Sequence, residues 1–281
     1  MARVRNQASR LNQANLLKRA RGVTAIGRHS QKGKVSKTQL TELGRSRAKW
    51  AGQNLPQGFV VSARRGELPR QGWTARYMVD TYPGQKLKRI PMATALGTAR
   101  WMPDLKAIEA KLMELGRIEV QKQYADGKIE WDIYNPKNKA KAEALAAEVG
   151  DAKFLSDWVN GKLNPRLIAP PETVGTEILK GSIQNTQALM NTSIQKPFGL
   201  NVTSSWYESA ILKVLGIDYR TVEPKRKTKA KHPQALSAPG KGSYFKETEA
   251  MLFFHLPDGK MILSWRGKKF DVTKPLAKIL K

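Results

Sequence analysis

Apolar residues recur at helical spacing in the stretch that follows Asp104. They are Leu105, Ile108, Leu112 and Leu115. A spacing of three to four residues places these side chains on one face of a helix. Asp104 can cap the amino end of that helix, and Gly116 can end it. The pattern predicts an amphipathic helix over residues 105–116.

Alternation of apolar and polar residues replaces this spacing between residues 117 and 134. Two alternating runs, RIEVQKQY and IEWDIY, flank the tetrapeptide ADGK. An Asp-Gly pair between alternating runs is a strong local signal for a β-hairpin. We therefore expect an antiparallel hairpin over residues 117–134.

Helical patterns return after Pro136. Ser205 and Glu208 have the spacing of a capping box, which marks the amino end of the last of these helices. The helices are predicted over residues 137–149, 151–163, 172–195 and 204–216. Together they make a small helical module.

The end of the chain alternates again. Strands are predicted over residues 244–256, 260–265 and 269–272, and Asp258 and Gly259 form the first turn between them. A sheet of three strands is marginally stable alone, so this meander must pack on another part of the chain.

The charge of the chain is concentrated in two segments. The 281 residues carry a formal charge of +27. Residues 1–49 hold thirteen Lys and Arg against one acid, and residues 224–246 hold seven against none. Such segments bury too little apolar surface to offset the entropy of ordering them. A field of this size favours a polyanionic partner, so we expect flexible arms that bind nucleic acid.

These patterns combine into an α+β fold with four parts. The parts are a disordered basic N-terminal arm (1–49), a mixed core with a β-hairpin that ends in a small helical module (50–222), a basic linker (223–243) and a small C-terminal β-sheet, a three-stranded antiparallel meander (244–281).

Lys and Arg in the two basic segments are the candidate binding residues, because they neutralise phosphates without an exact geometry. A solvated tail that only aids solubility is the alternative reading. The candidates are Arg10, Lys18, Arg19, Arg21, Arg28, Lys32, Lys34, Lys37, Lys225, Arg226, Lys227, Lys229 and Lys231.

Catalytic and metal-binding chemistry has less support in the sequence. The chain has no Cys, which removes disulfides and thiolate chemistry. We expect no cofactor and no metal. A magnesium site for phosphodiester cleavage on the terminal sheet is one interpretation of its polar residues, but a half-solvated strand face is favoured. The ligands of that site would be Glu247, Glu249, His255, Asp258 and Asp271.

Three further motifs have competing interpretations. Ala146 and Gly150 have the spacing of a helix-turn-helix with a recognition helix over 152–159, but an ordinary helical hairpin is favoured. Gly22 and Gly27 have the separation of a phosphate-binding loop, yet Arg28 and His29 stand where Lys and Ser or Thr are needed. The aromatic residues Trp73, Tyr77 and Tyr82 could stack on bases, although core packing is the default.

The sequence favours a non-catalytic, largely sequence-independent nucleic-acid-binding protein, a component of a genome-containing assembly such as a phage virion. The alternatives are a ribonucleoprotein component, a metal-dependent nuclease, or a replication-priming protein that uses Tyr207 or Tyr219. The expected partners are DNA or RNA and other protein subunits, with no membrane, because no apolar stretch is long enough to span one. The expected location is the cytoplasm or the virion interior.

Overall fold

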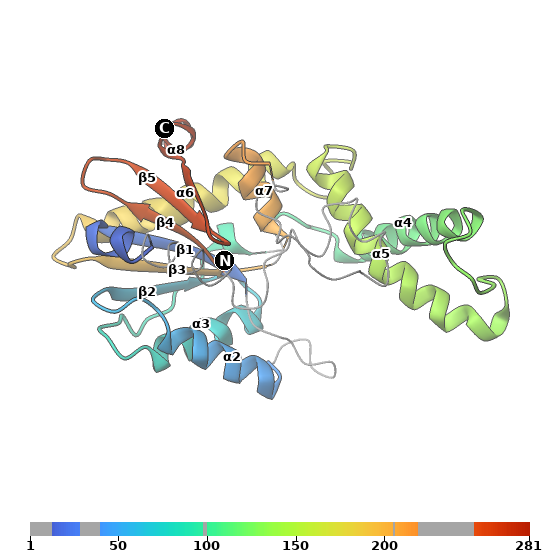
Figure 1. Cartoon of the computed structure of the whole chain (residues 1–281), viewed down its shortest axis with the longest axis horizontal. Coiled ribbons are helices and arrows are strands. Elements are labelled where there is room, and N and C mark those ends of the chain that lie inside the picture. Colours follow the sequence, from blue (N-terminus) through green and yellow to red (C-terminus); the bar gives the residue numbers. More distant parts are fainter. Residues whose placement is uncertain (1–12, 29–39, 98–99, 205, 219–249) are drawn as a thin grey trace, which may run out of the picture.

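A six-stranded mixed sheet lies at the centre of the computed structural model, which describes residues 13–28, 40–97, 100–204, 206–218 and 250–281 (Figure 1). The spatial order of the strands is β2-β3-β1-β4-β5-β6. The strands are β1 (Gly22–Arg28), β2 (Val60–Arg65), β3 (Pro197–Thr203), β4 (Ala250–His255), β5 (Met261–Trp265) and β6 (Lys268–Asp271).

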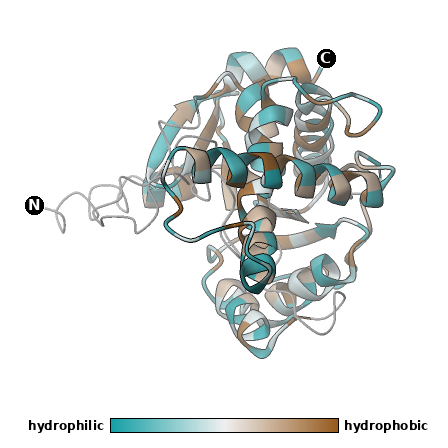
Figure 2. Cartoon of the chain, turned by 90° about the vertical axis from the view of Figure 1, so that its right-hand side faces the viewer, coloured by the Kyte–Doolittle hydropathy of each residue, from teal (hydrophilic) through white to brown (hydrophobic). Residues whose placement is uncertain are grey.

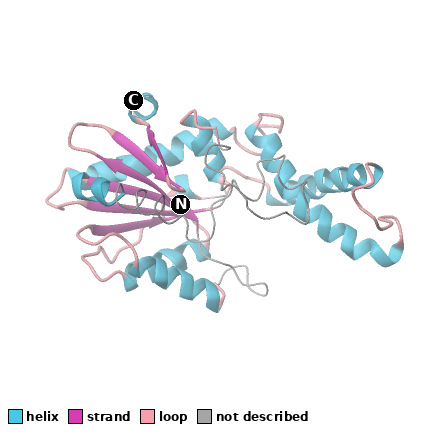
Figure 3. Cartoon of the chain, viewed as in Figure 1, coloured by secondary structure: helices cyan, strands magenta, loops and turns pink. Residues whose placement is uncertain are grey.

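Helices cover both faces of this sheet, which makes the fold a mixed α+β arrangement (Figure 3). The helices are α2 (Glu42–Gln53), α3 (Pro69–Thr81), α4 (Leu105–Ala125), α5 (Lys139–Val159), α6 (Pro171–Met190), α7 (Tyr207–Val214) and α8 (Thr273–Ile279), and residues 13–19 are also helical. The 3-10 turns η1 (Thr94–Leu96) and η2 (Pro136–Asn138) lie in connections. Within the described residues, no helix has the length and apolar character needed to cross a membrane.

Strands β2, β3 and β1 run parallel, whereas β4 runs antiparallel to β1. In β1, Val23 pairs with Phe198 and Arg28 pairs with Thr203. The carboxyl ends of the three parallel strands therefore meet at one edge of the sheet. We call this the carboxyl edge.

Each face of the sheet has its own hydrophobic core, because neighbouring residues of a strand point to opposite faces. Val23 and Ala25 of β1 lie in the core covered by α2 and α3. Ile26 lies in the core covered by α6 and α7. Helices α4 and α5 form a hairpin that projects away from the sheet beyond the carboxyl edge (Figure 1). Figure 2, which views the molecule from this side, shows hydrophilic and hydrophobic residues interspersed along the helices.

The expected disordered N-terminal arm is wrong for part of its length. Residues 22–28 form β1, which lies inside the sheet between β3 and β4, and Glu42–Gln53 form α2. Six of the seven residues of β1 are buried. A strand that is buried on both faces reads as a short apolar run without alternation. Cations flank GVTAIG on both sides, so an interpretation based on charge assigned this short apolar run to the arm.

The expected hairpin over 117–134 is also wrong. Helix α4 begins after Asp104, whose carboxylate accepts from Ala107 N at 2.9 Å as predicted, but it continues past Gly116 to Ala125. Gly127, with φ of +67°, follows the end of α4, and Lys128 N donates back to Gln123 O at 2.9 Å. The Asp-Gly pair thus ends a helix here, a position in which glycine is also favoured.

Small residues allow α4 and α5 to approach closely, and α5 is one continuous helix rather than two. A Cβ atom on Gly116 would lie 1.9 Å from Ala146 O, and one on Gly150 would lie 2.2 Å from Leu112 O. Gly150 therefore serves helix packing and not a turn. The helix-turn-helix reading of this segment is wrong, and so is the favoured reading of two helices that form an ordinary hairpin.

The C-terminal strands are antiparallel neighbours, as their alternation predicts, with Gly259 at φ of +78° in the first turn. They do not form a sheet of their own, because β4 pairs with β1 along its length. The hydrogen bonds of β1 provide the packing partner that an isolated meander lacks. The predicted linker, residues 223–243, lies outside the described residues.

Candidate functional site

Two arginines come together at the carboxyl edge from separate elements. Arg28 is the last residue of β1, and Arg70 lies in the first turn of α3, directly after Pro69. Both side chains are partly buried. Burial, followed by the positive charge of Arg28, lowers the pKa of Arg70. Two like charges held close together in a partly desolvated place favour the binding of an anion.

The amino end of α3 adds to this preference. Pro69 occupies the first helical position, and the helix is 13 residues long. The first N–H groups of a helix have no partner within the helix, and its dipole favours negative charge at this end. Of these groups, Leu68 N donates to Gln71 Oε1, Gln71 N donates to Leu68 O, and Pro69 has no N–H. The helix dipole and the Arg70 guanidinium thus act on the same small region.

Gln71 connects α3 to the end of β3. Its side chain is fully buried, and its Oε1 accepts from Leu68 N at 3.1 Å. Its Nε2 donates to Ser204 Oγ at 3.2 Å. A Cβ atom at Gly66 would lie 2.4 Å from Gln71 Oε1, so this position requires glycine. These contacts hold the first turn of α3 in a defined position beside β3.

The loop after η1 is fixed at the same edge. Thr203 Oγ1 donates to Leu96 O at 3.0 Å, and Tyr207 OH donates to Gly97 O at 3.0 Å. Both donors are buried. The backbone around the two arginines is therefore held by side-chain hydrogen bonds from β3 and α7.

A buried ion pair lies further along this edge. Glu208 of α7 is fully buried, and its Oε1 is 3.7 Å from Nη2 of Arg266. Arg266 sits in the turn between β5 and β6 with φ of +46°, and its guanidinium lies 4.1 Å from the centre of the Trp265 ring. This pair ties α7 to the turn between β5 and β6.

A different polar cluster lies in the middle of the sheet, under α6. His255 Nε2 is 2.8 Å from Thr24 Oγ1, and Thr24 Oγ1 donates to Thr186 Oγ1 at 2.8 Å. Because the Thr24 proton is used by Thr186, His255 Nε2 must donate to Thr24. Burial lowers the pKa of His255 to about 4, so its imidazole is neutral at pH 7. We call these three residues the central polar cluster.

The predicted nucleic-acid-binding residues are only partly described. Arg28 is at the carboxyl edge, whereas Arg21 precedes β1 at the opposite end and is exposed. Lys18 and Arg19 are exposed in helix 13–19. The structure therefore does not bring these four together. The others lie outside the described residues: Arg10, Lys32, Lys34, Lys37, Lys225, Arg226, Lys227, Lys229 and Lys231.

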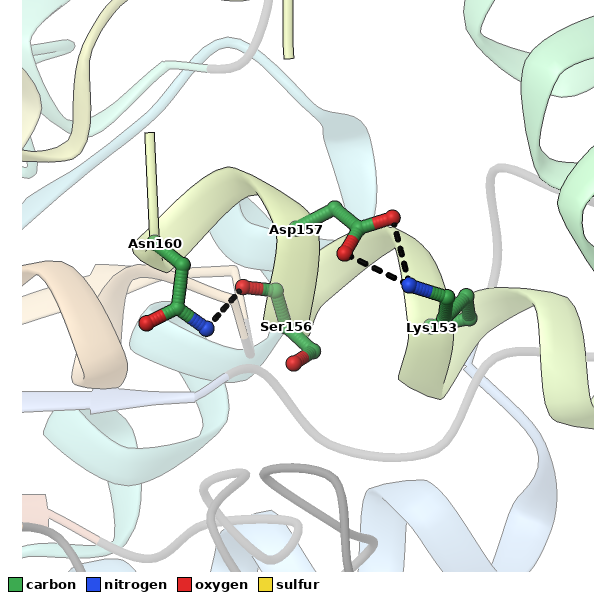
Figure 4. Close-up of polar contacts among 4 residues, drawn as sticks. All are labelled: Lys153, Ser156, Asp157 and Asn160. Atoms are coloured by element: carbon green, nitrogen blue, oxygen red, sulfur yellow. Dashed lines mark hydrogen bonds and ion pairs between the residues drawn. The ribbon is translucent and has the colours of Figure 1, made fainter. Parts of the chain in front are cut away.

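In the segment that the helix-turn-helix reading made a recognition helix, and in the residue after it, polar side chains bond within the same helix (Figure 4). Lys153 Nζ contacts both carboxylate oxygens of Asp157, at 2.7 and 2.9 Å. Asn160 Nδ2 donates to Ser156 O at 2.8 Å. These bonds join residues four apart on one helix, which is ordinary helix chemistry.

The aromatic residues considered for stacking differ in their environment. Tyr82 is buried, and its hydroxyl donates to the carbonyl oxygens of Pro56 and Phe59 at 2.9 and 2.8 Å. Core packing is therefore confirmed for Tyr82. Trp73 is instead 49% exposed, and its ring lies 6.2 Å from that of Tyr77.

The acids considered for a magnesium site are only partly described. Glu247 and Glu249 lie outside the described residues. In the part of the chain that is described, no three His, Asp or Glu side chains come together in a manner that could hold a metal ion.

Arg70, Gln71 and Ser204 were not predicted from the sequence as members of one site. The available signal was an apolar run, FVVSA, followed within a few residues by Pro69, the arrangement of a strand that leads into a helix.

No protein-family model and no curated protein matches this chain. Solved structures do match it. Phosphoglycerate mutase from Bacillus anthracis str. Sterne shares 12% identity at a TM-score of 0.47, over 94% of this chain and 100% of that one. A mycobacterial glucosyl-3-phosphoglycerate phosphatase shares 14% identity at a TM-score of 0.42, over 88% of this chain and 100% of that one. The phytase from D. castellii shares 10% identity at a TM-score of 0.49, over 93% of this chain and 78% of that one.

These matches correct the function expected from the sequence. The expected protein was a non-catalytic, nucleic-acid-binding component of a virion, and the matching structures are instead named as a mutase, a phosphatase and a phytase. The expectation that the chain is not an enzyme is corrected in the same way. Because the TM-scores are below 0.5, the chemistry considered next depends on this chain's own residues.

Proposed function

We propose that this protein hydrolyses a phosphate ester at the carboxyl edge, as an enzyme of histidine phosphatase type. The observation that carries the proposal is the approach of Arg28 and Arg70, at the end of β1 and in the first turn of α3. A phosphate group carries up to two negative charges and three oxygens that accept hydrogen bonds. Two guanidinium groups and a helix amino end are suited to that charge and shape.

The same groups would also act on the transition state. Negative charge spreads over the equatorial oxygens of a phosphoryl group as it transfers, so fixed donors around those oxygens lower the barrier. Arg28 is held by the sheet, and Arg70 by Pro69 and by the hydrogen bonds of Gln71. Donors held in this way need little reorganisation during the reaction.

The proposed nucleophile is His29, which follows Arg28 in the sequence. His29 lies outside the described residues, so its role is inferred from sequence position and chemistry. A neutral imidazole nitrogen can attack phosphorus while the bond to the ester oxygen breaks, and that oxygen leaves as the alcohol after taking up a proton. Water then attacks the phosphohistidine, releases inorganic phosphate and restores the neutral imidazole.

The proposal is tested by release of inorganic phosphate from small phosphate esters by the full chain. Arg70→Ala should lower kcat/KM on the order of a hundredfold to a thousandfold, because a preorganised donor to the phosphoryl oxygens is lost. Arg76→Ala is the matched control, since Arg76 lies on the same helix and is exposed. It should leave kcat/KM unchanged. His29→Ala should abolish turnover without lowering the melting temperature.

Two results would contradict the proposal. One is a purified, folded chain that releases no phosphate from any of a panel of monoesters. The other is turnover that survives His29→Ala and falls equally in Arg70→Ala and Arg76→Ala, which would indicate a general effect of positive charge.

A further inference from the structure

A small hollow lies between α2 and α3, beside the carboxyl edge. It has a volume of about 210 Å³ and is lined by Leu40, Arg45, Trp73 and Tyr77. Binding pockets for drug-sized molecules usually measure about 300 to 1,000 Å³. The hollow is therefore suited to one ring system and not to a whole larger ligand.

One aromatic side chain of the hollow, Trp73, is open to solvent, whereas Tyr77 is half-buried against the core. Trp73 is 49% exposed, whereas Tyr82 at the end of the same helix is 1% exposed. The rings of Trp73 and Tyr77 are 6.2 Å apart and inclined by 30°. Lys49 Nζ lies 5.7 Å from the centre of the Tyr77 ring. An aromatic pair bordered by cations favours a flat, electron-rich or anionic ligand.

The hollow and Arg70 share one face of α3. Residues 70, 73 and 77 are three and four apart, so they lie along the same side of the helix. With a rise of 1.5 Å per residue, Trp73 lies about 5 Å beyond Arg70 along the helix axis, and Tyr77 lies about 10 Å beyond Arg70. This is the separation expected between a phosphate group and a ring that are joined by a short linker such as a sugar.

We propose that the hollow between α2 and α3 binds the planar ring of the substrate while Arg28 and Arg70 bind its phosphate. The substrate class is then a phosphate monoester that carries an aromatic or heteroaromatic ring, as a nucleoside monophosphate does. This inference rests on the function proposed above and adds the specificity of the same site. Trp73 is its principal specificity-determining residue.

The test compares two esters of primary alcohols, adenosine monophosphate and glycerol 3-phosphate, which differ in the ring and not in the type of leaving group. Trp73→Ala should lower kcat/KM for adenosine monophosphate about tenfold and change that for glycerol 3-phosphate less than about twofold, as the loss of one stacking contact predicts. Trp73→Phe should retain most of the preference. Trp50→Ala is the matched control, because Trp50 is a 64% exposed tryptophan on α2 that does not line the hollow.

Calorimetric binding of adenosine monophosphate and adenosine to the same variants separates this inference from the proposed function. If neither these two esters nor any other monoester of the panel is hydrolysed, the proposed function fails. The ring site is still upheld if Trp73→Ala weakens binding about tenfold and Trp50→Ala does not. Three results overturn the ring site: no binding of either compound to the unmodified chain, equal losses in Trp73→Ala and Trp50→Ala, or an equal loss of both substrates in Trp73→Ala.

Discussion

The carboxyl edge and the central polar cluster both place polar groups in or near the sheet, but they differ in the charge that those groups carry. In the central polar cluster, His255, Thr24 and Thr186 form a closed chain of hydrogen bonds with no net charge at pH 7. At the carboxyl edge, Arg28 and Arg70 bring two like charges together. A neutral, internally bonded cluster stabilises a fold, whereas gathered charges of one sign favour a ligand of the opposite sign.

The difference arises from position along the same strand. Thr24 and Arg28 both belong to β1, four residues apart. Thr24 lies where α6 covers the sheet, so its hydroxyl needs a buried partner. Arg28 lies where the strand ends, so its long side chain can reach the space beyond the sheet. Changes at the two positions should therefore affect different properties of the protein.

The largest expected effect is on catalysis, at the carboxyl edge. Arg28→Ala should lower kcat/KM for a phosphate ester on the order of a hundredfold to a thousandfold. The matched control is Arg21→Ala, because Arg21 is an exposed arginine just before the other end of β1. Equal activity of the two variants would contradict a catalytic role that is specific to Arg28.

The next effect is on stability as a function of pH, in the central polar cluster. The pKa of His255 is about 4 in the folded chain and 6.5 without burial. Between these values the unfolded chain binds more protons, so the stabilisation is fully present above pH 6.5 and is lost as the pH falls toward 4. The loss should amount to about 3 kcal/mol.

Urea unfolding at pH 7 and at pH 4.5 measures this loss. His255→Gln should show a smaller decrease in unfolding free energy between the two pH values, because the titrating group is gone. An unchanged pH dependence in that variant would show that other groups are responsible.

A smaller effect is expected from filling space under α6. A Cβ atom on Gly199 would lie 2.2 Å from Thr186 Oγ1, so Gly199→Ala should displace that hydroxyl from Thr24 and destabilise the fold by about 1 to 3 kcal/mol. Adding Thr186→Ala should recover part of this loss in denaturant unfolding, since the colliding atom is removed. Strictly additive losses would contradict the contact.

The smallest effect returns to the carboxyl edge. Ser204→Ala removes the hydroxyl that accepts from Gln71 at 3.2 Å. Because one neutral hydrogen bond contributes about 1 kcal/mol, unfolding free energy should fall by about that amount. The activity should fall several-fold if Gln71 positions Arg70. A fall in stability with unchanged kcat/KM would limit Gln71 to a structural role.

Parts of the fold with strong local signals could be predicted from the sequence. The Asp104 cap, the helix that follows it and the antiparallel C-terminal strands all follow from short-range patterns. RIEVQKQY fits both an alternating and a helical pattern, so the pattern alone does not distinguish a strand from a helix in this segment. The backbone of α5 passes close to Gly116, and Val120 and Gln123 are buried on the same helix, so packing extended the helix.

The candidate site was harder to predict, because its residues are far apart in the sequence. Arg28 was identified as a binding residue, but as one cation of a flexible arm. Arg70 and Ser204 come to its neighbourhood only because β3 pairs with β1 on one side and with β2 on the other. The local sequence around these residues does not predict that strand pairing.

The sequence by itself determined the short-range features of this protein: its caps, its glycine turns, the amphipathic face after Asp104 and the excess of positive charge. These depend on neighbouring residues, whose chemistry is visible in the chain. Only the tertiary structure decided that GVTAIGR is an inner strand, that the terminal meander extends its sheet, and that Arg28 and Arg70 lie together. Those outcomes depend on burial and pairing between distant segments, and burial can select a structure that charge and local pattern do not indicate.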